Sequence, residues 1–293
     1  MRTISLLFHD VYDADPRESG FRSGAAGRYK LSIRDFEAQL AGVARVRADV
    51  PVLVTEMTGG LERTRGLKAS GYRRYPRDSD VPFLFTVDDG GLSYYTLVAD
   101  RLEARSWRGH CFVSTDAIGS RGFLSAAQIR ELDARGHVIG SHSASHPERF
   151  SACAAERMRH EWSRSRQVLE DLLGHEVSAA SVPGGYYSRG VARTARDAGL
   201  GVLFTSEPTT SMYDESGILV VGRFTIRRRH APDAAARLVQ RAPWARYREW
   251  ASWNAKGLAK PLLGPLYIRA ADWILCESSV SSVRLQADHD RSG

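Results

Sequence analysis

From residue 81 onward, short apolar segments alternate with longer amphipathic ones, and this alternation limits the fold more than any other feature. Strands that alternate with helices pair in parallel through right-handed crossovers. We expect strands at 82–87, 111–113, 137–140, 177–182, 202–205 and 218–221, and helices at 93–105, 125–136, 154–173 and 188–198. This count favours a closed or nearly closed α/β barrel over an open sheet.

The first 80 residues are less regular. Residues 4–8 predict a buried strand, and residues 51–54 predict a second one. Ser32 is a suitable cap for a helix in which Ile33, Phe36 and Leu40 recur at helical spacing. Segments 10–29 and 59–80 are rich in glycine, arginine and aspartate, which predicts loops.

Two adjacent carboxylates follow the strand at 82–87, where Asp88 and Asp89 lead into Gly90 and Gly91. Barrel enzymes place their chemistry at the carboxyl ends of strands. Successive residues in an extended segment point in opposite directions, so one carboxylate can bind a metal while the other takes a proton. A solvated strand-to-helix turn explains the same residues without function.

Two histidines, His142 and His146, follow the strand at 137–140. At this spacing the imidazoles lie on one face if the loop forms a helical turn. A carboxylate from another strand end completes a set of two histidines and one aspartate with open positions, typical of a catalytic metal. The sequence therefore predicts a divalent metal site.

A turn with the sequence Pro183-Gly184-Gly185-Tyr186 follows the strand at 177–182. Its glycines permit close approach of the backbone to a ligand, and a backbone N–H here can stabilise an oxyanion. We therefore take Gly184, Gly185 and Tyr186 as candidate oxyanion and substrate-binding residues.

These three segments together resemble the first three motifs of the polysaccharide deacetylases, the NodB-homology or carbohydrate esterase family 4 enzymes. The resemblance covers about residues 82–224. It implies a deformed (β/α) barrel, a divalent metal, usually zinc, and hydrolysis of N-acetyl or O-acetyl groups on glycans. It further implies Asp88 as general base, Asp89, His142 and His146 as metal ligands, and the Gly184 N–H as oxyanion donor.

Two positions depart from the family pattern. The third motif normally begins with an arginine that orients the base, and here that position is Ser181; Arg223 or Arg227 are the candidates to replace it. The family's closing histidine, a general acid, is not evident late in the chain. His9, which ends the first strand, resembles the acid of a subset that acts on bacterial exopolysaccharides, and His230 is the alternative.

The chain divides into a barrel over 1–230, a helical extension over 231–278 and a polar tail over 279–293. The extension contains Trp244, Trp250, Trp253 and Trp273 among basic residues. Both a helix on a membrane surface and a helix packed by its aromatic side on the barrel have this composition, and we favour the second.

The net charge of +7 invites a nucleic-acid interpretation, but 37 of the 41 basic residues are arginine and no nucleic-acid-binding motif occurs. Cys111, Cys153 and Cys276 are widely spaced, which indicates neither disulfides nor a thiolate metal site. No signal peptide or spanning segment is evident, so we expect a cytoplasmic protein, with the inner face of the membrane as an alternative.

The function predicted is metal-dependent removal of acetyl groups, N-acetyl first, from a bacterial polysaccharide or its lipid-linked precursor. Two alternatives stay open: a hydrolase of the same fold that acts on a small non-sugar amide, and a catalytically inactive glycan-binding protein. Retention of Asp88 together with all three metal ligands argues against the second, because a binder needs no free base beside them. The sequence does not determine the oligomeric state.

Overall fold

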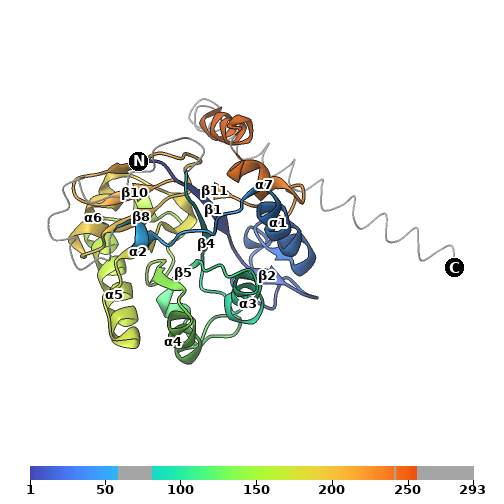
Figure 1. Ribbon diagram of the computed structural model, residues 1–293. Helices are drawn as coiled ribbons and strands as arrows, with labels where there is room; N and C mark the ends of the chain where they lie inside the picture. Colours follow the sequence, from blue (N-terminus) through green and yellow to red (C-terminus); the bar gives the residue numbers. More distant parts are fainter. Residues whose placement is uncertain (59–80, 241, 256–293) are drawn as a thin grey trace, which may run out of the picture. The chain divides into compact units, whose positions relative to one another are not determined.

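The computed structural model describes residues 1–58, 81–240 and 242–255, and the chain forms two units, Met1–Arg246 and Tyr247–Gly293. The first unit holds a sheet in which nine described strands run in the order β11-β1-β4-β5-β6-β7-β8-β10-β9 (Figure 1). All neighbouring pairs are parallel except β10 with β9. The strands are β1 (Ile4–Phe8), β4 (Phe83–Val87), β5 (His110–Val113), β6 (Val138–Ser141), β7 (Ala179–Ser181), β8 (Val202–Phe204), β9 (Met212–Asp214), β10 (Leu219–Val221) and β11 (Phe224–Thr225).

The ends of this sheet are drawn together by a very short connection. Only Gly222 and Arg223 separate β10 from β11, yet the two strands belong to opposite sides of the strand order. A connection this short spans at most about 10 Å, so the sheet must curl until its two sides face each other. The result is the deformed (β/α) barrel that the sequence predicts, with its seam at Arg223.

Helices cover the outside of the sheet (Figure 1). Side-chain caps begin three of them: Ser32, the cap that the sequence predicts, accepts from the Asp35 N–H, Ser188 accepts from the Val191 N–H, and Ser125 forms a capping box with Gln128. The helices are α1 (Ile33–Val46), α2 (Val54–Met57), α3 (Ala99–Glu103, after a π-helical turn at Tyr94–Val98), α4 (Ala126–Ala134), α5 (Ala155–Leu173), α6 (Arg189–Asp197) and α7 (Ala234–Val239).

The side chains of β4 divide between two cores. Phe83 and Phe85 pack into the cluster that contains residues of α1 and α3, whereas Leu84 packs with Phe112 and Phe204 from β5 and β8. The second cluster fills the barrel interior, and the rings of Phe112 and Phe204 lie 5.1 Å apart there. This apolar interior forms the floor on which the polar residues after the strands rest.

Some expected elements differ in the structure. Residues 51–53 form no strand and lead into α2, so the strand predicted at 51–54 is wrong; its Val-Leu-Val run is too short to distinguish the two states. The sequence also failed to indicate β2 (Val11–Tyr12), β3 (Leu31–Ser32), β9 and β11, each of two or three residues. The loop predicted at 59–80 lies outside the described residues.

The helical segment α7 belongs to the first unit. Gln39 of α1 holds it through both ends of its amide, since Nε2 donates to the Ala231 carbonyl and Oε1 accepts from the Ala235 N–H, each at 2.8 Å. Residues 244–255 are also helical, and their aromatic side chains are exposed, with 74% of Trp244 and 58% of Tyr247 accessible. Trp273 and Cys276 lie outside the described residues. The predicted division at 230 and 278 stays a prediction.

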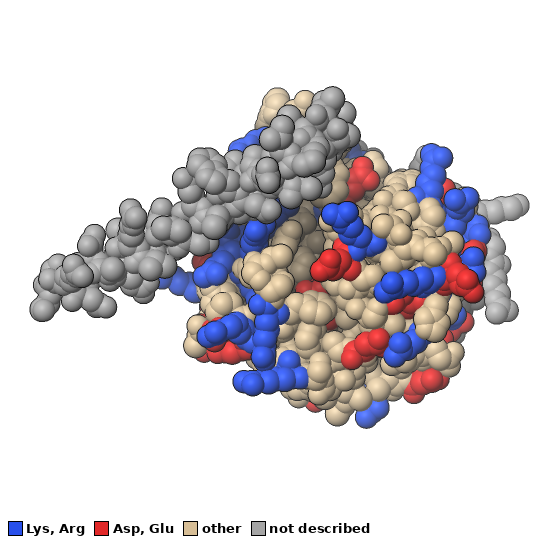
Figure 2. Space-filling model, turned by 180° about the vertical axis from the view of Figure 1, so that it is seen from behind, with Lys and Arg blue, Asp and Glu red and all other residues tan. Residues whose placement is uncertain are grey.

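Among the described residues, no helix has the length and apolar character needed to cross a bilayer. On the face shown in Figure 2, Lys and Arg side chains are interspersed with Asp and Glu. The net positive charge is therefore not gathered into one continuous basic band on that face. Cys111 is buried and Cys153 half-buried, and both are free thiols.

Candidate active site

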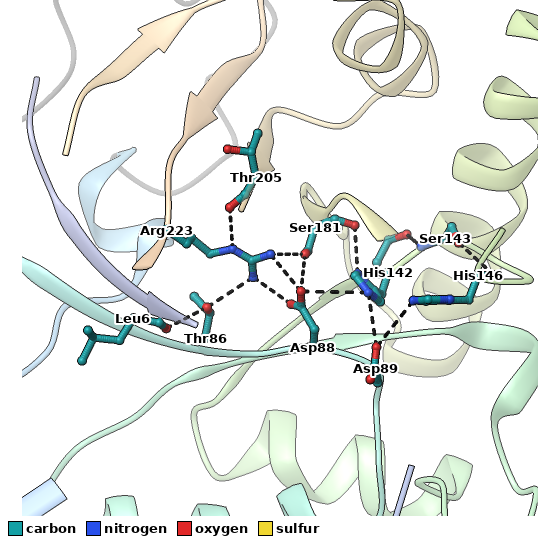
Figure 3. A network of polar contacts seen from close by, with 11 residues as sticks. Leu6, Thr86, Asp88, Asp89, His142, Ser143, His146, Ser181, Thr205 and Arg223 are labelled. Carbon is teal, nitrogen blue, oxygen red and sulfur yellow. Dashed lines mark hydrogen bonds and ion pairs between the residues drawn. The ribbon is translucent and has the colours of Figure 1, made fainter. Parts of the chain in front are cut away.

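Polar side chains from five strand ends meet above the apolar floor of the barrel (Figure 3). Asp88 and Asp89 follow β4, His142 follows β6, and Ser181 ends β7. The connection between β10 and β11 adds Arg223, and His9 follows β1. These are carboxyl ends of parallel strands, where barrel folds gather catalytic groups.

Asp89, His142 and His146 offer three donor atoms that all lie within 4.8 Å of one another. The Oδ1 atom of Asp89 lies 3.4 Å from His142 Nε2 and 3.6 Å from His146 Nε2. Both distances exceed the usual range of an N–H···O hydrogen bond. They match the edge of a tetrahedron with bonds of about 2.0–2.1 Å, which is about 3.3 Å, the geometry of a zinc-type ion.

The orientation of His142 also suits metal binding. Its Nδ1 atom lies 3.0 Å from the backbone carbonyl of Ser181, which can only accept a hydrogen bond. Nδ1 therefore carries the proton and Nε2, which faces Asp89, keeps its lone pair. The side chains present fit a divalent cation, with one carboxylate and two imidazoles as ligands. The identity of the cation is part of the proposed function.

Charges around Asp89 hold it in the anionic form. Burial alone raises the pKa of this carboxyl, but the close contact with His142 and the charges of His9, His142 and His146 lower the pKa below its ordinary value. For His146 the balance runs the other way, since burial and then the neighbouring His142 lower its pKa. A neutral imidazole and an ionised carboxylate are the forms that ligate metals.

The segment that carries the two histidines is not the helical turn that the i, i+4 spacing predicts. Ser143 and His146 have φ angles of 64° and 53°, in the left-handed region that non-glycine residues seldom adopt. The imidazoles converge all the same, with ring centroids 5.0 Å apart. The convergence comes from a tight loop whose internal hydrogen bonds run from Ser143 N to Ser141 Oγ and from His146 N to Ser143 Oγ.

Asp88 forms a buried ion pair with Arg223, while its Oδ2 atom also lies 3.9 Å from His142 Nε2 (Figure 3). The guanidinium binds both carboxylate oxygens, with Nη1 at 2.7 Å from Oδ1 and Nη2 at 2.8 Å from Oδ2. Ser181 Oγ donates to Oδ2 at 2.9 Å. Burial raises the pKa of Asp88, but Arg223 and His142 outweigh it, so that the pKa lies below its ordinary value. Asp88 is therefore ionised.

Arg223 takes the part of the arginine that the third motif lacks, and Arg227 does not. Its guanidinium is fully buried at the barrel seam, with Nε donating to the Thr205 carbonyl and Nη1 to Thr86 Oγ1. Nη2 also donates to Ser181 Oγ at 2.7 Å. The small side chain at position 181 leaves the space that the guanidinium enters from the far side of the barrel.

His9 is half-buried, and its Nδ1 atom is buried. Its charge is among those that lower the pKa values of both Asp88 and Asp89. Burial lowers the pKa of His9 itself, against the opposing charges of Asp89 and Asp88. The buried Nδ1 atom has no hydrogen-bond partner among the described residues, and the Tyr29 ring lies at 4.7 Å between centroids. This position is compatible with a role for His9 in the site, and the choice between His9 and His230 stays a prediction.

The segment at 10–30 is anchored beside the site. Asp10 Oδ1 accepts from Ser19 Oγ at 2.5 Å and from Ser93 Oγ at 2.9 Å. Lys30 Nζ donates to the carbonyls of Pro16 and Ser19. The anchored segment brings the Phe21 ring to 4.7 Å from the His146 ring, between centroids. The sequence indicated only a loop here and gave no sign that it borders a metal ligand.

The turn after β7 has the conformation that its glycines permit. Gly184 and Gly185 have φ angles of 60° and 70°. A Cβ atom on Gly185 would lie 2.8 Å from Ser206, so a larger residue would collide there. Tyr186 is exposed, as expected of a residue that meets substrate. The roles of Gly184, Gly185 and Tyr186 toward an oxyanion or substrate stay predictions.

Comparison with known proteins agrees with this site. Residues 77–203 match the family model for polysaccharide deacetylase. The protein YxkH of Bacillus subtilis (strain 168) is 23% identical over 139 residues, which are 47% of this chain and 50% of that protein. The chain thus spans about half the length of the curated relative it matches.

Solved structures share the fold. The Streptococcus pyogenes deacetylase PplD in complex with acetate has a TM-score of 0.61 at 19% identity, over 80% of this chain and 96% of the other. IcaB from Ammonifex degensii has a TM-score of 0.61 at 21% identity, over 84% and 97%. BC0361, a polysaccharide deacetylase from Bacillus cereus, has a TM-score of 0.63 at 16% identity, over 82% and 69%. At these identities the likeness concerns the fold alone.

Proposed function

We propose that this chain, of which residues 77–203 match the family model for polysaccharide deacetylase, is a divalent-metal-dependent hydrolase that removes N-acetyl groups from a bacterial polysaccharide or its lipid-linked precursor. One observation carries the proposal: a buried, ionised carboxylate with its own arginine lies beside three metal-ligating donors. Asp88 Oδ2 is 3.9 Å from His142 Nε2, so the base and the ligand set share one site.

Asp89, His142 and His146 would hold the ion, most simply Zn²⁺. Such an ion supplies Lewis-acid polarisation of a carbonyl and a nucleophile at neutral pH. Asp88 is suited to the base because Arg223 and Ser181 fix its carboxylate in one orientation. Each carboxylate oxygen has two lone pairs. Oδ2 accepts from both Arg223 and Ser181, whereas Oδ1 accepts from Arg223 alone, so one lone pair of Oδ1 stays free to accept a proton from water.

The reaction then balances as a hydrolysis. The water oxygen bonds to the acetyl carbon while Asp88 takes a water proton. The carbon–nitrogen bond breaks, and the leaving nitrogen receives a proton from the imidazole of His9, so that acetate and a free amine result. The Gly184 N–H is the expected donor to the carbonyl oxygen as negative charge develops on it. The charges of Asp89 and Asp88 act on the pKa of His9, which is compatible with a place for its imidazole near this region.

The test is acetate release by purified, metal-analysed protein from a panel of N-acetylated oligosaccharides and bacterial exopolysaccharides. We expect release with the zinc-loaded protein, its loss on chelation and its return when zinc is added. Asp88→Asn should retain the wild-type metal content and lose nearly all activity, because Asn cannot accept the proton. An Asp88→Asn protein with wild-type turnover would refute the assignment of the base. Failure of the zinc-loaded wild-type protein on every glycan would refute the function.

A further inference from the structure

One further buried carboxylate, which is neither a proposed metal ligand nor the proposed base, lies against the loop that carries His142 and His146 (the histidine loop). Glu161 belongs to α5 and is only 5% exposed. Its Oε2 accepts from the backbone N–H groups of Ala144 and Ser145 at 3.1 and 2.8 Å, and its Oε1 accepts from Ser145 Oγ at 2.6 Å. Among the described residues, no Lys, Arg or His side chain lies within ion-pair distance of this carboxylate. All three donors come from the segment between His142 and His146.

This segment does not owe its shape to regular secondary structure. Ser143 and His146, which flank Ala144 and Ser145, both have left-handed φ angles. Residues held in such conformations persist only where the surroundings impose them. The two N–H groups at the centre of the loop point toward a single acceptor, the Glu161 carboxylate. Hydrogen bonds to an ionised acceptor are stronger than those between neutral groups.

We propose that Glu161 is a positioning residue that preorganises the two imidazoles for the metal. Its carboxylate holds the loop through hydrogen bonds from the two residues between the ligands, Ala144 and Ser145, and touches neither the ion nor the substrate. Replacing one carboxylate oxygen with an NH₂ group, as in Glu161→Gln, leaves either the two backbone N–H groups or the Ser145 hydroxyl without an acceptor in a buried environment. The loop then relaxes toward conformations in which His142 and His146 no longer converge, and the affinity for metal falls.

The inference rests on the metal site of the proposed function, so its test reads metal affinity rather than acetate release. Loss of a partner that orients metal ligands typically weakens metal binding about 10–100-fold. We expect Glu161→Gln to raise the dissociation constant for Zn²⁺ within this range in competition with a chromogenic chelator. Excess zinc should restore the activity of this variant toward the wild-type value, which a general loss of folding would not allow.

A matched control lies on the same helix. Glu170 of α5 also accepts a backbone N–H, from Val177 at 2.9 Å, and pairs with Arg166 at 2.8 Å, but makes no contact with the histidine loop. Glu170→Gln should change the melting temperature without changing the affinity for zinc. If Glu161→Ala does not fold, Glu161→Gln, which has the same size, provides the measurement.

Two results would overturn the inference: a Glu161→Gln protein that binds zinc as tightly as the wild type, or equal losses of affinity in the Glu161 and Glu170 variants. A wild-type protein that binds zinc but releases no acetate would refute the proposed function and leave the role of Glu161 intact. A wild-type protein without affinity for divalent ions would overturn both.

Discussion

The pair of Asp88 and Arg223 permits a prediction whose size follows from burial. In Arg223→Met the guanidinium disappears and an ionised carboxylate stays in the barrel with only Ser181 as a donor. Removing one member of a fully buried pair costs about 3–5 kcal/mol, mostly because the other charge is left without compensation. Since the guanidinium is fully buried and the carboxylate almost so, little solvent screening reduces this cost.

A cost of this size is measurable, because a domain is stable by about 5–15 kcal/mol in total. Urea unfolding of the metal-free proteins gives the free energy of unfolding from the midpoint and the slope. Asp88→Asn alone should also be destabilising, because it leaves the guanidinium buried without an anion. The double variant carries neither isolated charge, so its cost should be smaller than the sum of the single costs by at least about 1.5 kcal/mol.

The control is Arg227→Met, which removes the other arginine that the sequence offered for this role. Its expected effect lies within about 0.5 kcal/mol of wild type, as for surface substitutions in general. In activity, Arg223→Met should lower kcat/KM by about 10²–10⁴-fold, because the base loses the guanidinium that orients its carboxylate. Single costs that add to within about 0.5 kcal/mol would show that Arg223 fills the barrel seam without acting on Asp88.

Three further predictions concern the surroundings of the site. His9→Ala should lower kcat about 10²–10⁴-fold at unchanged zinc content if the imidazole is the acid; near wild-type turnover would exclude that role. Burial raises the pKa of Asp10 from 3.8 to about 6, so the native state holds this proton more tightly than the unfolded chain does. The free energy of unfolding therefore falls by about 3 kcal/mol as the pH rises from 3.8 to 6. Asp10→Asn should lack this fall in urea titrations at pH 4 and 7; an unchanged pH slope would contradict the assignment. We also expect the exposed aromatic residues Trp244 and Tyr247 to favour contact with a membrane surface. Replacing both with alanine should then reduce the fraction of protein that floats with anionic vesicles. Equal flotation of variant and wild type would argue against that contact.

The sequence predicted what depends on short range. The alternation of strands and helices, the helix cap at Ser32 and the position of each polar motif at a strand end are all local properties, and the structure confirms them. Because strand ends converge at one rim of a barrel, the set of Asp89, His142 and His146 could also be anticipated.

The sequence could not predict contacts between residues far apart in the chain, because these contacts depend on how the barrel closes. Asp88 and Arg223 are 135 residues apart, and their contact depends on how the sheet curls at the connection of β10 and β11. The left-handed angles of Ser143 and His146 are likewise imposed by their partners, since neither residue type favours them. The three donors that converge on Glu161 likewise depend on how α5 packs against this loop.

The serine at position 181 therefore shows that the site requires a guanidinium beside the Asp88 carboxylate, and not an arginine at one particular position of the chain. A carboxylate buried on an apolar floor of Phe112 and Phe204 cannot stay ionised without a cation nearby. The guanidinium of Arg223, which lies 5.8 Å from the centroids of both rings, meets that requirement. It contacts the small side chain at position 181 on its way to the carboxylate. Serine at 181 and arginine at 223 thus form one solution, in which the serine both admits the guanidinium and donates to the same carboxylate oxygen.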